Sequence, residues 1–268
     1  GAGTFLTSSS SANIVNNDYV IGGDFSFKGN LGLTLNGATT LAAGATTITV
    51  DTVLTTLTLN GIISGTDNTS ALIKAGQGTL ILGNNNTFQG GITLNGGNLV
   101  LSGLNGGSAS PIPGGFALIN SADAVLSLLN NGGGNGTVIT YANDITLSGA
   151  ISGGGLTIGN NGANINNVVE VANLNIASGQ TLDVTGANGY QLRLLNVNTT
   201  GATAALLNPA LGTTIYVFNY GSLKPVNVGL GTVIFPEVPV LNTTTPLANG
   251  STLTSLNPVV PQAATLAS

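Results

Sequence analysis

The chain has 268 residues, of which 5% are charged, 4% are aromatic and 41 are Gly, and its formal net charge is −5. Four basic residues against nine acidic ones leave no footprint for nucleic acid. No apolar run approaches the roughly 20 residues of a membrane-spanning helix, and a hydrophobic fraction of 42% argues against disorder.

Several residue types that carry specific chemistry are absent from the sequence. There is no Cys, Met, Trp or His, which excludes disulfides, thiolate or imidazole metal sites and a Ser-His catalytic pair. The chain begins at Gly1 with neither an initiator Met nor a signal-peptide pattern. We therefore expect a processed product whose signal peptide has already been removed.

From about Phe25 to Leu195 the chain repeats one pattern, a strand of three to five residues followed by a Gly/Asn turn. "LTLNG" occurs at residues 33–37 and 57–61, and "ITLNG" occurs at 92–96. Alternating Leu and Thr places Leu on one face of each strand, and Asn-Gly turns the chain without strain. Repetition at such short intervals predicts a repeat architecture.

Two all-β folds accept short strands with frequent turns. A β-sandwich uses strands of five or six residues joined by tight hairpins, whereas a parallel β-helix uses shorter strands joined by bends. Turns such as "GNNNTFQGG" at 83–91 favour the β-helix, in which stacked Asn side chains form hydrogen-bonded ladders. Some ten coils about 4.8 Å apart would make a rod of about 50 Å, stabilised by contacts between neighbouring coils.

One segment resembles a known family. "GTLILGNNNTFQGGITLNGGNLVL" at 78–101 is similar to the autotransporter-associated β-strand repeat, through "GTL-L", "NNTF-GG" and "T-LNGG-L-L". "GTTIYVFNYGSL" at 212–223 resembles the closing segment near the end of such passenger domains. The resemblance implies a right-handed parallel β-helix displayed on the outer surface of a bacterium.

We predict a β-solenoid over residues 1–240 and an irregular, Pro-rich tail over 241–268. Seven of the nine prolines lie at or after Pro209, and because proline removes a ladder donor, regular coils should stop near Glu237. The tail is a linker or an arm that adds a strand to a neighbouring subunit. A C-terminal cap is expected over about 188–240, where four aromatic residues gather: Tyr190, Tyr216, Phe218 and Tyr220.

The acidic residues do not form an obvious active site. Polysaccharide-cleaving enzymes need clustered carboxylates, usually with basic neighbours. Asp18 and Asp24 form the closest pair here, and we expect no catalytic residue. The nine acids are scattered through the sequence: Asp18, Asp24, Asp51, Asp67, Asp123, Asp144, Glu170, Asp183 and Glu237.

Metal and cofactor sites are not expected either. Calcium takes six to eight oxygen ligands with several carboxylates, and no calcium-loop motif is present, so Asp67 and Asp144 are interpreted as ordinary turn residues. The glycine-rich stretches at 132–136 and 153–156 lack the Lys-Ser or Lys-Thr of a phosphate loop. They are interpreted as loops.

Two further side-chain types could be modified. Lys28 and Lys74 could form amide crosslinks to Asn, but we interpret both as ordinary solvated lysines. Glycosylation sequons are frequent in a chain this rich in Asn and Thr, at Asn68, Asn85, Asn135, Asn198, Asn242 and Asn249.

These observations favour a non-enzymatic, extracellular structural protein that forms part of a fibre, coat or display stalk. Its partners would be copies of itself, assembled head-to-tail or laterally, because an end-to-end contact that does not close gives a filament. The expected contacts are the first coil, Phe5 to Phe27, and the tail after Val240. The alternative is an adhesin passenger that recognises a cell-surface glycan or protein, with "NGGSASPIPGGF" at 105–116 as the candidate binding insertion. A polysaccharide-active enzyme is the third reading.

Overall fold

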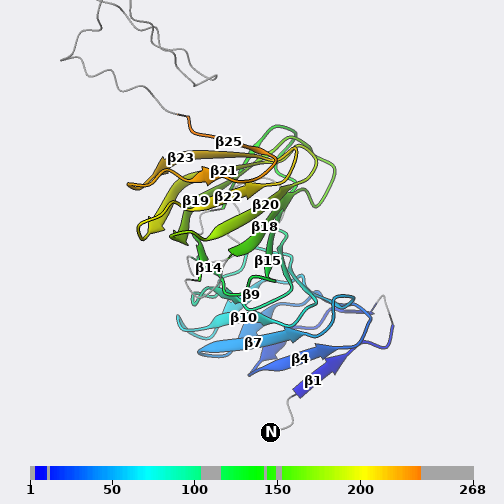
Figure 1. Ribbon diagram of the computed structural model, residues 1–268. Helices are drawn as coiled ribbons and strands as arrows, with labels where there is room; N and C mark the ends of the chain where they lie inside the picture. The colour runs from blue at the N-terminus through cyan, green and yellow to red at the C-terminus, as the bar shows by residue number, and fades with distance from the viewer. Residues whose placement is uncertain (1–3, 11–12, 104–115, 142–143, 149–152, 237–268) are drawn as a thin grey trace, which may run out of the picture.

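The protein is a single stack of short β-strands. The computed structural model describes residues 4–10, 13–103, 116–141, 144–148 and 153–236, and within these residues it contains strands and turns but no helix. The chain climbs one axis in about nine turns, from β1 (Thr4–Thr7) at one end to β25 (Thr232–Ile234) at the other (Figure 1). The fold is therefore a β-solenoid, close to the expected ten coils.

Three parallel sheets form the sides of the stack, and each strand lies beside the equivalent strand of the next turn. Sheet A runs in the order β1, β4 (Phe25–Lys28), β7 (Ala45–Val50), β10 (Ala71–Ala75), β12 (Ile92–Leu94), β14 (Phe116–Ile119), β17 (Asp144–Leu147), β19 (Val168–Ala177), β21 (Gln191–Thr200), β23 (Thr214–Tyr220) and β25, while β16 (Val138–Tyr141) pairs with β19.

Sheets B and C complete the stack. Sheet B runs in the order β2 (Asn13–Val15), β5 (Leu33–Leu35), β8 (Thr56–Leu59), β11 (Thr79–Leu82), β13 (Asn98–Leu101), β15 (Val125–Leu129), β18 (Gly153–Gly159), β20 (Thr181–Gly186), β22 (Leu206–Pro209) and β24 (Val226–Asn227). Sheet C holds β3 (Tyr19–Ile21), β6 (Thr39–Leu41) and β9 (Ile63–Gly65).

Every strand pairing in the described part of the chain is parallel. A sandwich built from hairpins would pair sequential strands antiparallel. The parallel β-helix predicted from the strand and turn lengths is therefore confirmed, and the sandwich is excluded.

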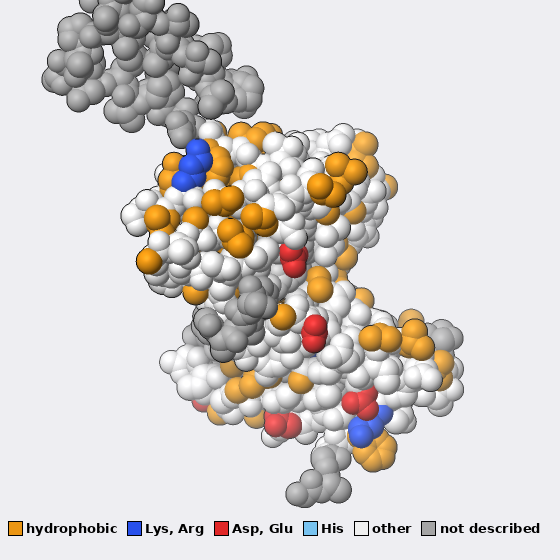
Figure 2. Space-filling view, viewed as in Figure 1, with side chains coloured by type: hydrophobic (Ala, Val, Ile, Leu, Met, Phe, Trp, Pro, Cys, Tyr) orange, Lys and Arg blue, Asp and Glu red, His pale blue; other side chains and the backbone are white. Residues whose placement is uncertain are grey.

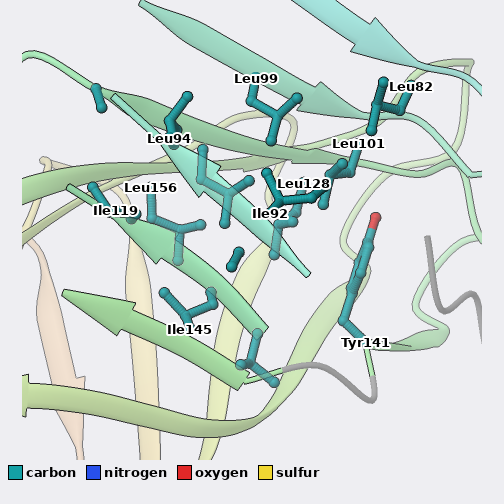
Figure 3. Packing of buried hydrophobic residues seen from close by; sticks show 14 of the residues in the cluster. Leu82, Ile92, Leu94, Leu99, Leu101, Ile119, Leu128, Tyr141, Ile145 and Leu156 are labelled. Carbon is teal, nitrogen blue, oxygen red and sulfur yellow. The ribbon is translucent and has the colours of Figure 1, made fainter. Parts of the chain in front are cut away.

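The core is a set of aliphatic columns that run along the axis. In sheet B the inward residue of each strand lies in register on the next, as Leu57 does on Leu80 and Leu80 on Leu99. Figure 3 shows such side chains packed between the sheets, with Leu94, Ile119 and others pointing into one interior. Burying a Leu or Ile contributes about 1.5–3 kcal/mol, so stability accumulates with each added coil.

Glycine at one corner is required by the distance between coils. Gly37 and Gly61 occupy equivalent positions after β5 and β8. A Cβ on Gly37 would lie 1.9 Å from the carbonyl oxygen of Asn17, and a Cβ on Gly61 would lie 2.0 Å from that of Gly37. The "LTLNG" repeat thus keeps Gly because the preceding coil leaves no room for a side chain.

Asparagine ladders join the coils, as predicted from the sequence. At the corner beside those glycines, the Asn36 amide donates to Asn16 at 2.9 Å and the Asn60 amide donates to Asn36 at 3.2 Å. On sheet A the amide of Asn173 donates to Asp144 at 2.6 Å, and that of Asn196 donates to Asn173 at 3.1 Å. These rungs satisfy side chains without adding net repulsion between coils.

The later coils differ from the short-strand pattern expected from the sequence. β19 and β21 are ten residues long. The first part of β19 pairs with β16 and the last part pairs with β17, and inward alternation shifts phase near Ala172. Two short strands separated by residues 142–143 in one coil are thus a single bent strand in the next, so two sides of the stack merge into sheet A.

Candidate functional site

The carboxylates that the sequence singled out anchor the backbone of neighbouring coils. Asp18 accepts a hydrogen bond from the Ala38 N–H at 2.8 Å, and Asp24 accepts one from the Thr47 N–H at 2.7 Å. Each therefore ties the first coil to the second. Nowhere in the described residues do three or more acids gather as a metal site would need.

The two turn aspartates also have structural partners. Asp67 accepts hydrogen bonds from the backbone and hydroxyl of Thr69 at 2.9 and 2.7 Å, and these bonds lower the pKa of its carboxyl. Asp144 heads the ladder that continues to Asn173. Asp67 therefore lies in a turn, as interpreted, whereas Asp144 is the first residue of β17, so its interpretation as a turn residue was wrong.

One ion pair is present among the described residues, on the outer face of sheet A. Arg193 Nη1 lies 3.0 Å from Glu170 Oε2, while Thr140 donates to the other Glu170 oxygen at 3.1 Å. The guanidinium also lies 5.5 Å from the ring centre of Phe218. These residues come from four stacked strands, β16, β19, β21 and β23, so the group links four successive coils.

Lys74 corrects the interpretation of the lysines as solvated side chains. Lys28 is exposed, but Lys74 is 0% exposed and points inward. Its ammonium donates to the carbonyl oxygens of Ala75, Gly76 and Gly96 at 3.0, 2.8 and 3.0 Å. It therefore joins the bend after β10 to the equivalent bend one coil later.

The burial of Lys74 was not predicted from the sequence, because the equivalent positions in neighbouring coils hold aliphatic residues. In the register of sheet A it lies between Ile48 of β7 and Leu94 of β12. Burial lowers the pKa of Lys74 from 10.5 to about 8. Its inward position in "ALIKA" followed from period-2 alternation, but a carbonyl cradle could not be read from one strand.

The aromatic residues expected in a C-terminal cap lie in different environments. Tyr220 and Phe235 pack edge to face, with ring centres 5.6 Å apart, and both are partly buried against the core. Phe218 is exposed on the outer face. Tyr190 is fully buried and belongs to a polar network inside the stack, so it does not cover the last coil.

That network is a set of hydrogen bonds between Tyr190 and loops that contain several asparagines. The Tyr190 hydroxyl donates to the Asn130 carbonyl at 2.8 Å and accepts from the Asn167 amide at 3.0 Å. Asn167 is also buried and accepts from the Thr137 N–H at 2.9 Å. Burial raises the pKa of the Tyr190 hydroxyl. The glycine-rich 132–136 stretch lies in one of these loops, as interpreted, whereas 153–156 belongs to the strand β18, so its interpretation as a loop was wrong.

The N-terminal end of the stack is an open, apolar surface. Among the described residues, β1, β2 and β3 each pair with a single neighbour, so one edge of each of these three strands lacks a ladder partner there. A cavity of about 490 Å³, which we call the N-terminal opening, lies between β1 and β3 and is lined by Thr4, Leu6, Tyr19, Ile21, Phe25 and Leu35.

Side chains around the opening are unusually exposed for apolar residues. Phe5 is 64% exposed, Val20 is 74% exposed, and the inward-facing Leu6 is 38% exposed. In the middle coils inward-facing aliphatic residues such as Leu80 are buried, because a coil lies on each side of them. Figure 2, which views the stack from the side, shows acidic groups and a basic group beside hydrophobic side chains toward the N-terminal end.

Comparison with protein-family models finds the passenger-associated-transport-repeat at residues 72–101. No curated protein and no solved structure gave a match. The repeat covers β10 to β13, including Lys74 and its carbonyl cradle. Repeat and solenoid together fit an autotransporter passenger-like β-helix protein, and the repeat indicates an extracellular or cell-surface location. The described residues contain no helix of the length and apolarity needed to cross a membrane.

Proposed function

We propose that this passenger-like β-helix is a structural, non-catalytic protein of the bacterial surface that assembles head-to-tail into a fibre, coat or stalk. The observation that carries the proposal is the N-terminal opening. Unpaired strand edges beside an exposed apolar core are a template for pairing with another chain, and solenoids need their ends covered. A rigid stack whose end accepts another subunit extends in one direction.

The chemistry of the described residues supports a structural role. Asp18, Asp24 and Asp144 are engaged in bonds between coils. A catalytic carboxylate would need to face a substrate with its oxygens available. What the chain offers along its length is backbone ladders and aliphatic columns, which provide shape and stiffness.

Deleting residues 241–268 tests the assembly. The tail lies outside the described residues and is proposed as one of the two contact segments, the other being the first coil. We expect the truncated protein to remain β-rich and monomeric, while the full chain forms multimers in light scattering. Multimers of unchanged size after the deletion would count against the tail.

A substitution at the N-terminal opening tests the other proposed contact segment, the first coil. Leu6→Asp places a carboxylate at the N-terminal opening, and we expect it to reduce multimers without abolishing the circular-dichroism signal of β-structure. Ile165→Asp is the matched control, because Ile165 is similarly exposed, at 42%, but lies in a loop on the side of the stack. Equal loss in both variants would indicate a general effect of charge.

The second candidate is an adhesin passenger that binds a cell-surface glycan or protein. Its proposed insertion, residues 105–115, lies outside the described residues; Phe116 begins β14. The observation in its favour is the exposed Phe218 beside the Arg193–Glu170 pair, since aromatic and Arg side chains recur in binding hot spots. A glycan array probed with wild type and Phe218→Ala would separate this role from assembly.

A further inference from the structure

The free edge of β1 borders the N-terminal opening directly. Thr4 and Leu6 face inward and line the cavity, whereas Phe5 between them faces outward. A strand paired with this edge would bring alternate side chains over the cavity, because successive residues point to opposite faces. The volume of about 490 Å³ is within the range of about 300–1,000 Å³ typical of ligand pockets.

The corner between β2 and β3 leaves no room for another full coil of the same shape at the N-terminal end of the stack. In the next two coils this corner position is Gly37 and then Gly61, where a Cβ would lie 1.9 and 2.0 Å from the carbonyl of the preceding coil. The first coil has Asn17 at the equivalent position. With the same geometry, the Asn17 Cβ would collide with any further coil of this shape.

The first coil therefore accepts a single strand along β1 more readily than a complete turn. That distinction separates strand addition, in which main-chain hydrogen bonds and one or two side-chain pockets supply the binding, from stacking of two intact solenoid ends. The Asn17 corner stays uncovered when only β1 gains a partner.

We propose that the strand is residues 251–254 of a second copy of this chain. This inference rests on the head-to-tail assembly proposed above and names its contact. "STLT" at 251–254 resembles "TFLT" in β1 in its second half, where Leu253 matches the inward-facing Leu6 and Thr254 matches Thr7. Leu253 enters the N-terminal opening, and Thr252 and Thr254 lie outward beside Phe5.

The position and length of the remaining chain allow this contact. The described residues end at Pro236, just after β25, at the end of the stack opposite β1 (Figure 1). The sequence continues for 32 residues, since 268 − 236 = 32. The proposed strand begins 15 residues after Pro236, since 251 − 236 = 15, and at about 3.3 Å per extended residue this segment reaches roughly 50 Å, enough to run from the last coil of one subunit to the first coil of the next.

Paired cysteines test the contact, because the chain contains no Cys of its own. Phe5→Cys protein is mixed with Thr252→Cys or Thr254→Cys protein under mild oxidation and run on a non-reducing gel. Neighbouring strands lie about 4.8 Å apart, within the Cα separation of a disulfide. We expect a heterodimer band that a reductant removes, in at least one of the two mixtures.

Thr49→Cys in place of Phe5→Cys is the matched control. Thr49 also faces outward on sheet A, but its strand, β7, already has partners on both sides. A synthetic peptide of residues 247–257 should also reduce multimers of the full chain, whereas the same peptide with Leu253→Asp should not.

The outcomes separate this inference from the function it rests on. If the protein forms multimers but Phe5→Cys does not crosslink to the tail cysteines, or if Thr49→Cys crosslinks to them equally well, the named contact is overturned. Head-to-tail assembly would then remain in place. Phe5→Cys dimers formed by that variant alone would show head-to-head docking and overturn the named contact as well. If a chain that carries both Phe5→Cys and a tail cysteine crosslinks only within itself, the tail covers the opening of its own subunit. That result would overturn the contact between two copies. A protein that stays monomeric throughout would overturn both proposals.

Discussion

Raising the pH should stabilise this protein, and Lys74 should be the cause. The folded chain holds the Lys74 ammonium in a buried site with three carbonyl acceptors, and burial lowers its pKa from 10.5 to about 8. A base whose pKa is lowered on folding binds its proton more tightly when unfolded. The unfolded chain therefore binds more protons between these two pKa values, and the free energy of unfolding rises with pH.

The magnitude follows from the two pKa values, about 8 and 10.5. Between pH 7.5 and pH 9.5 the free energy of unfolding should increase by about 2 kcal/mol. The window ends below pH 10 for a reason. Burial raises the pKa of Tyr141 and Tyr190, so the unfolded chain would lose these phenolic protons first, and stability would fall at higher pH.

Urea unfolding followed by circular dichroism at pH 7.5 and pH 9.5 measures the effect. Wild type and Lys28→Met should both gain about 2 kcal/mol, because Lys28 is exposed. Lys74→Met should show no such gain. A wild type that is equally stable at both pH values, or a Lys74→Met variant that gains as much, would refute the reasoning.

Two further substitutions test the packing between coils. Gly61→Ala should destabilise the fold by at least about 2 kcal/mol, since its Cβ would lie 2.0 Å from the Gly37 carbonyl oxygen, whereas Gly22→Ala, with nothing within 4 Å, should be nearly neutral in the same urea assay. Similar losses in both would remove the steric account of the repeat. Asn167→Ala should cost about 1–3 kcal/mol, because it leaves the Thr137 N–H without its acceptor and removes one of the two partners of the buried Tyr190 hydroxyl; a loss under about 0.5 kcal/mol, as at an ordinary surface site, would contradict the network.

The architecture was predictable because local pattern and global packing agree in this chain. Residues 33–35 and 57–59 alternate Leu and Thr, and the structure places both Leu residues of each strand inside. Asn36 and Asn60 follow those strands and form the expected ladder. When repeated segments stack in parallel register, equivalent residues of successive coils contact one another, so the repeat itself predicts these contacts.

What sequence reasoning missed depends on contacts between coils that differ in detail. Lys74 was interpreted as solvated because the carbonyls around it come from two bends more than 20 residues apart, as the Lys74–Gly96 bond shows. Tyr190 was assigned to a cap because aromatic residues cluster near it in sequence, yet its partners lie on loops of earlier coils. Two sides of the stack merge in β19, and the sequence carries only a weak sign of this. The alternation of inward and outward side chains changes phase near Ala172.

Assembly could be proposed from the sequence alone, whereas a proposal for its contact needed the ends of the described stack. Low charge and many Asn residues suggested stacking in general. The specific argument for a single strand needed the comparison of Asn17 with Gly37 and Gly61, which only the distances between coils provide.

Electron microscopy of the purified full-length protein tests most directly whether this solenoid builds a larger structure. About nine turns and one added strand between subunits, all spaced about 4.8 Å apart, predict fibres with an axial repeat of at least about 48 Å, and Leu6→Asp protein should show only short rods. Isolated rods of wild type at every concentration would contradict the account.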